Sequence, residues 1–271
     1  MTVRSYRQGL SWSPGACIMD AMPQTGMLTN KIALVTGASR GIGAAAARLF
    51  AREGATVVLA ARTESALKAV TADTPGASYV VADLGEVASI EHVVTTVVER
   101  HGRLDIAFNN AAVGVPPHPI ADYPEDDFDL VMRVNLKGVF YAISAEVKAM
   151  TRSGGGAIVN NSSVGSLIAN PGLPAYAAAK RAVNSITESA AVAYGPAGIR
   201  VNAIAPGLTV TDMVEEWNRH DPGVIERIIA GTPLRRAATP EEIAESAAWL
   251  LSDRASYVTG AILPVTGGAA V

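Results

Sequence analysis

The sequence predicts a single α/β domain with a Rossmann-like, doubly wound sheet of about seven parallel strands and helices on both faces. From Lys31 onward, short β-branched runs alternate with longer amphipathic or alanine-rich runs, as expected for parallel strands joined by crossover helices. A glycine-rich turn follows the first of these strands. The chain has 271 residues, 49% of them hydrophobic, which is enough to bury one large core.

The same alternation predicts the order of the elements. Right-handed crossovers place a ligand crevice at the carboxyl ends of the strands. The stretch 207–242 interrupts the alternation, and a long insertion at this place is expected to cover the crevice as a lid. We expect strands near 31–36, 56–60, 78–82, 104–108, 157–161, 199–204 and 261–265, and helices over 42–53, 63–70, 86–100, 125–150, 174–194 and 240–252.

Residues 1–28 have neither helical nor strand periodicity, so we expect a disordered N-terminal extension, or a start placed too far upstream, before a domain at 29–271. The net charge of −3 gives no basic field for nucleic acid. One cysteine, Cys17, permits no intrachain disulfide and fits a reducing compartment. No apolar run reaches the roughly 18 residues of a membrane span. We therefore expect a cytoplasmic protein whose partners are small molecules.

The turn after the first strand has the composition of a phosphate-binding loop, in the stretch IALVTGASRGIGAAAARLF. Gly37 permits a tight turn, Gly41 lets the backbone approach a pyrophosphate, and Gly43 lets the helix pack close to the sheet. The spacing is G-x-x-x-G-x-G rather than G-x-G-x-x-G. Glycines at such turns also serve packing alone, but the flanking strand and helix favour a dinucleotide site.

Tyr176 and Lys180 lie four residues apart in YAAAK, and hence on one face of a helix. A phenol with a pKa near 10 is a poor acid–base catalyst at neutral pH, and an adjacent ammonium group favours the phenolate. Ser163 follows a predicted buried strand, where its hydroxyl could hold a carbonyl or alkoxide oxygen. Each residue alone also suits a solvated helix face or an ordinary strand end.

Several motifs occur in the order found in one enzyme family. They are TGASRGIG, NNAA at 109–112, VNLKGVF at 134–140, NSS at 161–163, YAAAK and VNAIAPG at 201–207. Together with the stretch PEEIAESAAWLLSDRASYVTGAILPVTGG, the chain resembles the short-chain dehydrogenase/reductase family over about residues 30–268. Ala112, Ala238 and Thr266 depart from the usual family pattern. None of these departures touches the catalytic set.

The resemblance implies a role for each matching residue. Tyr176 matches the acid/base, Ser163 the substrate-polarising serine, Lys180 the residue that binds the nicotinamide ribose, and Asn135 the asparagine that holds a relay water. It also implies a homotetramer built partly from helices 125–150 and 174–194. The residues implied to bind the cofactor are Gly37, Ser39, Arg40, Gly41, Ile42, Gly43, Arg62, Asp83, Leu84, Asn110, Tyr176, Lys180, Pro206, Gly207, Thr209 and Thr211.

The resemblance implies reversible hydride transfer between a nicotinamide and a secondary alcohol or ketone. The predicted pocket stretches 113–120 and 164–173 are mostly apolar, which favours a small apolar substrate, and no cluster of ligands suggests a metal. A 3-ketoacyl-carrier reductase is one alternative, although Ala197 stands where those enzymes usually have a basic residue. A dinucleotide sensor without catalysis, or another reaction on the same scaffold, is a further alternative.

The residues at the end of the second predicted strand, Ala61 and Arg62, indicate which nicotinamide cofactor is preferred. NAD-preferring members of the family usually place an aspartate at the position of Ala61, so the group that repels a 2′-phosphate is absent. Arg62 follows directly, and Arg40 is expected to approach the same phosphate from the other side of the adenosine. Two solvated surface arginines are the alternative. Because guanidinium groups bind phosphate in paired hydrogen bonds, we expect NADP(H) to be preferred over NAD(H).

Overall fold

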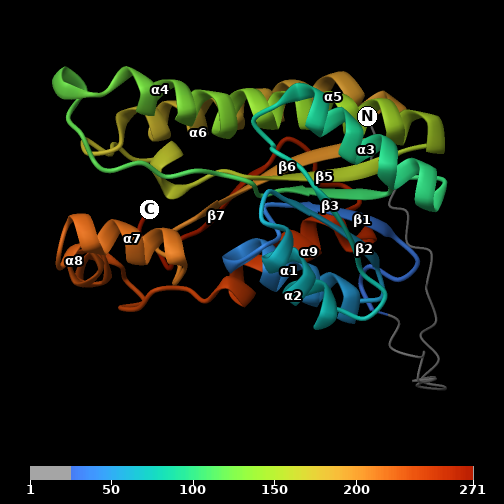
Figure 1. Cartoon of the computed structure of the whole chain (residues 1–271), viewed down its shortest axis with the longest axis horizontal. Helices are drawn as coiled ribbons and strands as arrows, with labels where there is room; N and C mark the ends of the chain where they lie inside the picture. The colour runs from blue at the N-terminus through green and yellow to red at the C-terminus, as the bar shows by residue number, and fades with distance from the viewer. Residues whose placement is uncertain (1–25, 271) are drawn as a thin grey trace, which may run out of the picture.

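The computed structural model describes residues 26–270 and folds them around a parallel sheet in the order β3-β2-β1-β4-β5-β6-β7 (Figure 1). This confirms the predicted fold class, and each strand begins and ends within two residues of its predicted position. The order reverses between β1 and β4, which pair with each other. The strands are β1 (Ile32–Thr36), β2 (Thr56–Ala61), β3 (Ser78–Val81), β4 (Ile106–Asn109), β5 (Gly156–Asn161), β6 (Ile199–Pro206) and β7 (Ile262–Val265).

Helices cover both faces of the sheet, as predicted. On one face α1, α2 and α9 pack against a core that includes Phe50, Leu67 and Ile243. On the other face α3, α5 and α6 bury a second core, which includes Met150 and Val183 (Figure 1). The helices are α1 (Gly41–Arg52), α2 (Glu64–Ala72), α3 (Val87–His101), α4 (Glu125–Met132), α5 (Val139–Ser153), α6 (Pro174–Tyr194), α7 (Asp212–His220), α8 (Val224–Gly231) and α9 (Pro240–Leu251).

The helix predicted over 125–150 is wrong as a single α-helix. Residues 133–138 form a π-helical turn between α4 and α5, and this turn carries Asn135. Both polar atoms of the Asn135 amide bond the backbone of Val113 in the facing loop. A π turn changes the helical hydrogen bonding while hydrophobic periodicity continues, so the sequence pattern could not reveal it.

The predicted boundary after residue 28 falls too late in the chain. Leu28 is fully buried, Met27 packs beside it in the core of α1 and α9, and Gly26 lies against the backbone of Glu53. Because this segment has no periodicity, the sequence did not indicate that Met27 and Leu28 pack into the core. Residues 1–25 of the predicted extension, including Cys17, lie outside the described residues.

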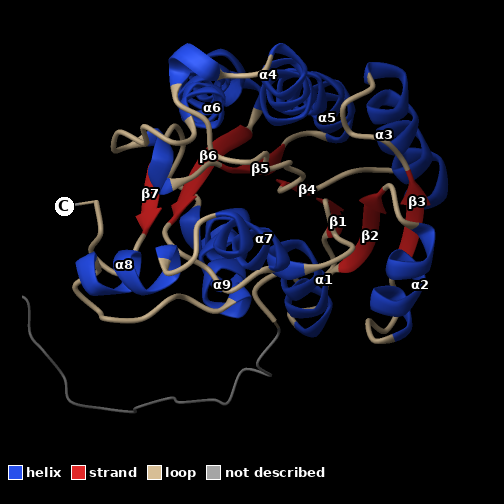
Figure 2. Ribbon diagram, turned by 60° about the vertical axis from the view of Figure 1, so that its left-hand side comes forward, coloured by secondary structure: helices blue, strands red, loops and turns tan. Residues whose placement is uncertain are grey.

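The stretch after β6 forms α7 and α8, which lie together beyond the carboxyl end of that strand (Figure 2). Thr211, directly before α7, lies close to the loop between β1 and α1: a methyl group on Gly41 would be 3.3 Å from its Cγ2 atom. The insertion thus reaches the predicted phosphate loop. Within the described part of the chain, no helix is long and apolar enough to cross a membrane.

Candidate active site

The loop between β1 and α1 has a backbone that only glycine fits closely. Gly37 and Gly41 have positive φ angles of 64° and 54°. A Cβ atom on Gly37 would lie 2.7 Å from the backbone of Ala111, and one on Gly43 would lie 2.3 Å from the Gly37 carbonyl oxygen. Glycine is therefore needed for close packing at both positions, which bears out the packing roles predicted for this turn.

The N-terminus of α1 fits an anion. Its N-cap residue, Arg40, makes no side-chain capping bond in the described structure, and the first turn carries no acidic residue. The first N–H groups of a helix have no partners within the helix and favour negative charge. A dinucleotide pyrophosphate fits this loop, which Ser39, Gly41, Ile42 and Gly43 form or flank.

Lys180 projects from α6 into a buried position at the end of β5. Its side chain is among the largest fully enclosed ones, with 2% of the residue exposed. The Nζ atom donates a hydrogen bond to the carbonyl oxygen of Asn161 at 2.7 Å and lies 5.6 Å from the centre of the Tyr176 ring. Burial lowers the pKa of Lys180 to about 8. An ammonium group has three donors, so two can serve ribose hydroxyls.

Tyr176 and Ser163 lie within hydrogen-bonding distance of each other. Burial raises the pKa of Tyr176 above its ordinary value, and a side-chain hydrogen bond with Ser163 partly offsets this rise. Ser163 Oγ also accepts a bond from the Gly165 N–H at 3.1 Å. The pKa of Tyr176 is therefore raised rather than lowered as expected from the sequence, because burial of the phenolate outweighs the hydrogen bond with Ser163.

Two asparagines hold the loops around this centre. Asn110 donates to the carbonyl oxygens of Thr36 and Gly37 at 3.1 and 3.2 Å, and it accepts from the Asn161 amide at 2.8 Å. Asn135, which is fully buried, bonds the Val113 N–H and carbonyl at 2.8 and 2.9 Å. Asn110 thus links the phosphate loop to the ends of β4 and β5.

The remaining predicted cofactor residues lie in loops at the carboxyl ends of the strands. Asp83 and Leu84 follow β3, and the Asp83 carboxylate accepts from the Gly85 N–H at 2.9 Å. Pro206 ends β6. Thr209 is buried and donates to the Gly207 carbonyl at 3.1 Å. These residues therefore lie along one edge of the sheet, because parallel strands end on the same side.

The two arginines predicted to meet a 2′-phosphate differ in their surroundings. Arg62 is exposed directly after β2, and Ala61 before it is buried. Arg40 is also exposed, but its guanidinium forms an ion pair with Asp212 of α7 at 3.1 Å. Asp212 was not part of the sequence prediction. A ligand phosphate at Arg40 would compete with this carboxylate.

A second buried polar cluster lies next to the site and was missed by the sequence interpretation. Glu146 of α5 is fully buried, and its Oε2 atom accepts a hydrogen bond from Asn109 at 2.9 Å. Burial raises the pKa of Glu146 to about 7. A signal was available, because Glu146 is a carboxylate on a helix face otherwise filled by small and apolar side chains such as Ala142 and Met150.

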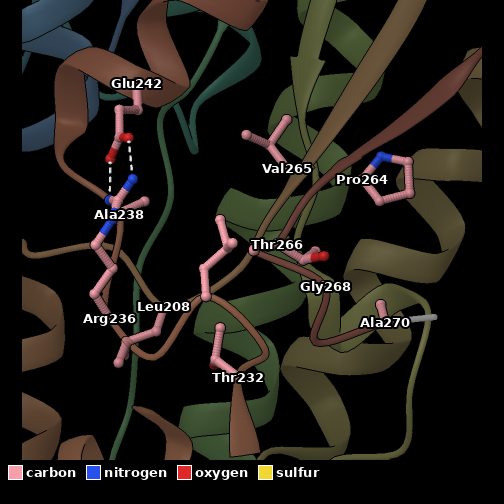
Figure 3. Close-up of a pocket in the computed structure, with 12 residues that line it drawn as sticks. Leu208, Thr232, Arg236, Ala238, Glu242, Pro264, Val265, Thr266, Gly268 and Ala270 are labelled. Carbon is pink, nitrogen blue, oxygen red and sulfur yellow. Dashed lines mark hydrogen bonds and ion pairs between the residues drawn. The ribbon is translucent and has the colours of Figure 1, made fainter.

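A cavity of about 430 Å³ lies between the insertion at 207–242 and the C-terminal residues 264–270, apart from the predicted catalytic residues (Figure 3). Ala238 and Thr266, two of the departures from the family pattern, line it. Near them the guanidinium of Arg236 binds both carboxylate oxygens of Glu242, at 2.6 and 2.7 Å. None of Ser163, Tyr176 and Lys180 lines this cavity. The described residues contain no cluster of side chains suited to a metal ion.

The fold and site define the class of protein. The family model described as enoyl-(acyl carrier protein) reductase matches residues 37–270. The chain is a member of the short-chain dehydrogenase/reductase family, whose oxidoreductases act on CH–OH and C=O groups with a nicotinamide dinucleotide. This confirms the resemblance that the motifs indicated.

Two reductases illustrate the relationship. The chain is 48% identical to an A-factor type gamma-butyrolactone 1'-reductase (1S-forming) of Streptomyces virginiae, over 90% of this chain and 96% of the relative. It is 38% identical to the levodione reductase of Leifsonia aquatica, again over 90% and 96%. A crystal structure of levodione reductase superposes with a TM-score of 0.87 at 37% identity and covers 90% of this chain and 98% of the other.

Proposed function

We propose that the protein reduces a small, mostly apolar ketone to a secondary alcohol, or runs the reverse reaction, with NADP(H). The observation that carries the proposal is the convergence of Ser163, Tyr176 and Lys180 at the end of β5, next to a loop suited to a pyrophosphate. A bound nicotinamide supplies or accepts the hydride. The chain itself must hold the carbonyl oxygen and move one proton.

Ser163 and Tyr176 hold the substrate oxygen, and Tyr176 donates the proton to it during reduction. Lys180 binds the ribose, and its charge lowers the free energy of the phenolate that remains. The Asn135 amide bonds Val113 through one N–H and one oxygen lone pair, which leaves one further donor and one further acceptor for a relay water. The raised pKa of Tyr176 keeps the acid protonated before the substrate arrives.

Replacing Tyr176 with phenylalanine tests this assignment. Turnover should fall by about a hundredfold to ten-thousandfold, the usual contribution of a positioned acid, while cofactor affinity remains because the ring remains. Cofactor binding is measured by reduced-nicotinamide fluorescence, and turnover by the loss of reduced-nicotinamide absorbance. Tyr194→Phe, on the far end of the same helix, is the matched control. Activity of Tyr176→Phe within tenfold of the parent would refute the mechanism.

The substrate is proposed to be a free small molecule. The two relatives are named as reductases of a gamma-butyrolactone and of levodione, and neither name refers to a carrier-bound chain. Ala197 leaves the surface before β6 without the basic group that an acidic carrier would meet. The alternative is a carrier-bound acyl substrate, as the description of the family model suggests.

A substrate panel separates these alternatives. Cyclic ketones, a lactone ketone, a carrier-bound 3-ketoacyl chain and a carrier-bound enoyl chain are each assayed with NADPH and with NADH. We expect turnover of the free ketones. Turnover of a carrier-bound chain alone would favour the alternative, and no turnover of any substrate despite cofactor binding would favour a sensor.

The NADP(H) preference is proposed from charge at the adenosine end of the crevice. Arg62 and Arg40 supply two cations, and the buried Ala61 supplies no carboxylate to repel a 2′-phosphate. Two contacts of about 1.5 to 3 kcal/mol each would favour NADP(H) by one to several orders of magnitude. The double variant Ala61→Asp, Arg62→Ile should reverse the preference in kcat/KM. A parent enzyme that favours NADH would contradict the proposal.

We also propose a homotetramer. Large apolar side chains are exposed on the outer faces of α5 and α6, including Phe140 and Val192, which are 52% and 82% exposed. Assembly of four copies would cover them. Sedimentation velocity at micromolar concentration should give a tetramer, and Phe140→Glu should dissociate it. A monomeric parent would contradict this proposal.

A further inference from the structure

The strongest unassigned feature is the buried polar cluster of Glu146 behind β4 and β5. Its members come from four elements, and each is at most 2% exposed. Asn109 Nδ2 donates to Glu146 Oε2 at 2.9 Å and to Asn160 Oδ1 at 3.1 Å. Asn160 in turn donates to the Thr187 hydroxyl at 2.9 Å. A chain of hydrogen bonds therefore runs from α5 through both strands to α6.

The cluster lies one residue away from the site along both strands. Asn109 and Asn160 are register partners at the end of the β4–β5 ladder. The next residues are Asn110, which holds the phosphate loop, and Asn161, whose carbonyl accepts the Lys180 bond. Asn161 also donates to Asn110 at 2.8 Å. Fixing the first pair of asparagines therefore fixes the backbone that presents the second pair.

The charge state of Glu146 follows from its partners. Two acceptor atoms of the cluster, Glu146 Oε1 and Asn109 Oδ1, have no hydrogen-bond partner among the described residues. A protonated carboxyl group adds one donor to a cluster that holds these two acceptors without a partner, whereas a carboxylate adds only acceptors. Burial favours the same protonated form, since it raises the pKa of Glu146 to about 7.

Among residues 26–270, Lys180 is the one buried cation that could neutralise a carboxylate there. Glu146 and Lys180 are the two ionisable side chains among the buried polar residues of the described chain. Lys180 is engaged on the Asn161 carbonyl. On the helical segments that pack against α5, His101 of α3 and Arg133 of the π-helical turn are half-buried, and Arg133 pairs with Glu86. The other charged side chains there are exposed, namely Glu91, His92, Glu99 and Arg100 on α3, Lys137 on the turn, and Arg181 and Glu188 on α6.

We propose that Glu146 is a positioning residue: as a neutral carboxylic acid it fixes Asn109 and Asn160, and through them the strand ends that present Asn110 and Asn161 to the cofactor and Lys180. The inference rests on the proposed function, because it places Glu146 behind that site. Glu146 acts through these neighbours and does not itself touch the substrate.

Three variants test the proposal. Glu146→Gln keeps a neutral, donor-bearing side chain and should retain kcat within about twofold. Glu146→Leu removes every polar atom and should lower kcat about tenfold to a hundredfold, the cost of small misplacement of reacting groups, with little change in the KM for the ketone. Glu188→Gln, an exposed carboxylate on α6, is the matched control and should behave as the parent.

Two readouts separate positioning from simple structural support. The parent should show the infrared carbonyl stretch of a protonated carboxyl group at neutral pH, and Glu146→Gln should lack that band. If Glu146→Leu does not fold, Thr187→Val serves in its place, because Thr187 lies at the far end of the chain of hydrogen bonds. Thr187→Val should also lower kcat. If the decrease in kcat across the variants is proportional to the decrease in melting temperature, the proposal is overturned.

The proposal also fails if Glu146→Gln is as slow as Glu146→Leu, or if the infrared band is absent from the parent. Its failure can be told from failure of the proposed function. An active Tyr176→Phe enzyme would remove the assignment of the acid, whereas the infrared band reports on Glu146 alone.

Discussion

Lys180 of α6 and Glu146 of α5 are two buried ionisable side chains on the same face of the sheet, and they have different hydrogen-bond partners. Both are at most 2% exposed, and burial moves both pKa values toward neutrality, to about 8 for Lys180 and about 7 for Glu146. Lys180 bonds the backbone carbonyl of Asn161 at the end of β5, whereas Glu146 bonds the side-chain amide of Asn109 at the end of β4. Burial alone therefore does not decide what such a group does.

The difference lies in what each group faces. Lys180 has donors left over beside Tyr176, so a ligand with hydroxyl groups can complete its hydrogen bonding. Glu146 faces neighbours that already belong to the protein, so a proton completes its hydrogen bonding instead. In the proposed function one buried group thus serves the reaction directly, and the other maintains the geometry around it.

The largest expected effect comes from Lys180→Met, which keeps the length of the side chain and removes the ammonium. We expect kcat/KM to fall about a thousandfold, because two charge-assisted bonds to the ribose of about 1.5 to 3 kcal/mol each are lost. Cofactor affinity is measured by fluorescence titration. Arg181→Met, an exposed neighbour, is the control. Unchanged affinity would show that Lys180 does not bind the ribose.

The stability of the protein should depend on the titration of Glu146. Its folded pKa of about 7 lies above the ordinary glutamate value of 4.5, so the unfolded chain releases the proton first as pH rises. The folded state is therefore destabilised progressively from about pH 4.5 to 7, by roughly 3 kcal/mol in all. Glu146→Gln should lack this loss. Urea unfolding at pH 5 and pH 8 measures it, and parallel curves for parent and variant would contradict the shift.

Lys180 should give the opposite slope at higher pH. Its folded pKa of about 8 lies below the ordinary lysine value of 10.5, so the unfolded chain binds more protons between these pH values. Stability from this group therefore rises as pH increases from about 8 to 10.5. Lys180→Met should remove that rise in urea unfolding between pH 8 and 10. A variant that keeps the parental slope would show that Lys180 is better solvated than the fold suggests.

The smallest effect is expected from an exposed pair, Arg40 and Asp212, whose side chains are 69% and 57% exposed. Solvent-exposed ion pairs contribute about 0 to 1 kcal/mol, so Asp212→Asn should leave the melting temperature almost unchanged. Affinity for NADPH should rise severalfold, because Arg40 no longer has a competing carboxylate. Affinity for NADH should stay the same. An equal gain for both cofactors would contradict the role of Arg40.

The sequence was sufficient to predict the structure where a local pattern of residues is compatible with one backbone conformation. Alternating hydrophobic runs predicted all seven strands, and the glycines at 37, 41 and 43 predicted a tight loop that the φ angles and close contacts bear out. The spacing of Tyr176 and Lys180 placed both on one helix face. These features depend on residues close together in the chain.

The rest depends on contacts between distant segments. The Glu146 cluster joins α5, β4, β5 and α6, and the Arg40 pair joins α1 to α7, so neither follows from spacing. The raised pKa of Tyr176 reflects the burial that these contacts create. Leu28 could not be placed either, because a single apolar residue in an irregular stretch carries no period.

The pH dependence of kcat for ketone reduction in the parent, Lys180→Met and Glu146→Gln tests the division of roles between the two buried groups most directly. Because Glu146 is protonated below its pKa of about 7, the account predicts that Glu146→Gln follows the parental profile below that pH. Lys180→Met should move the apparent pKa of the Tyr176 step upward, because the phenolate loses the adjacent charge. A Glu146→Gln profile displaced as far as that of Lys180→Met, or no displacement in Lys180→Met, would contradict it.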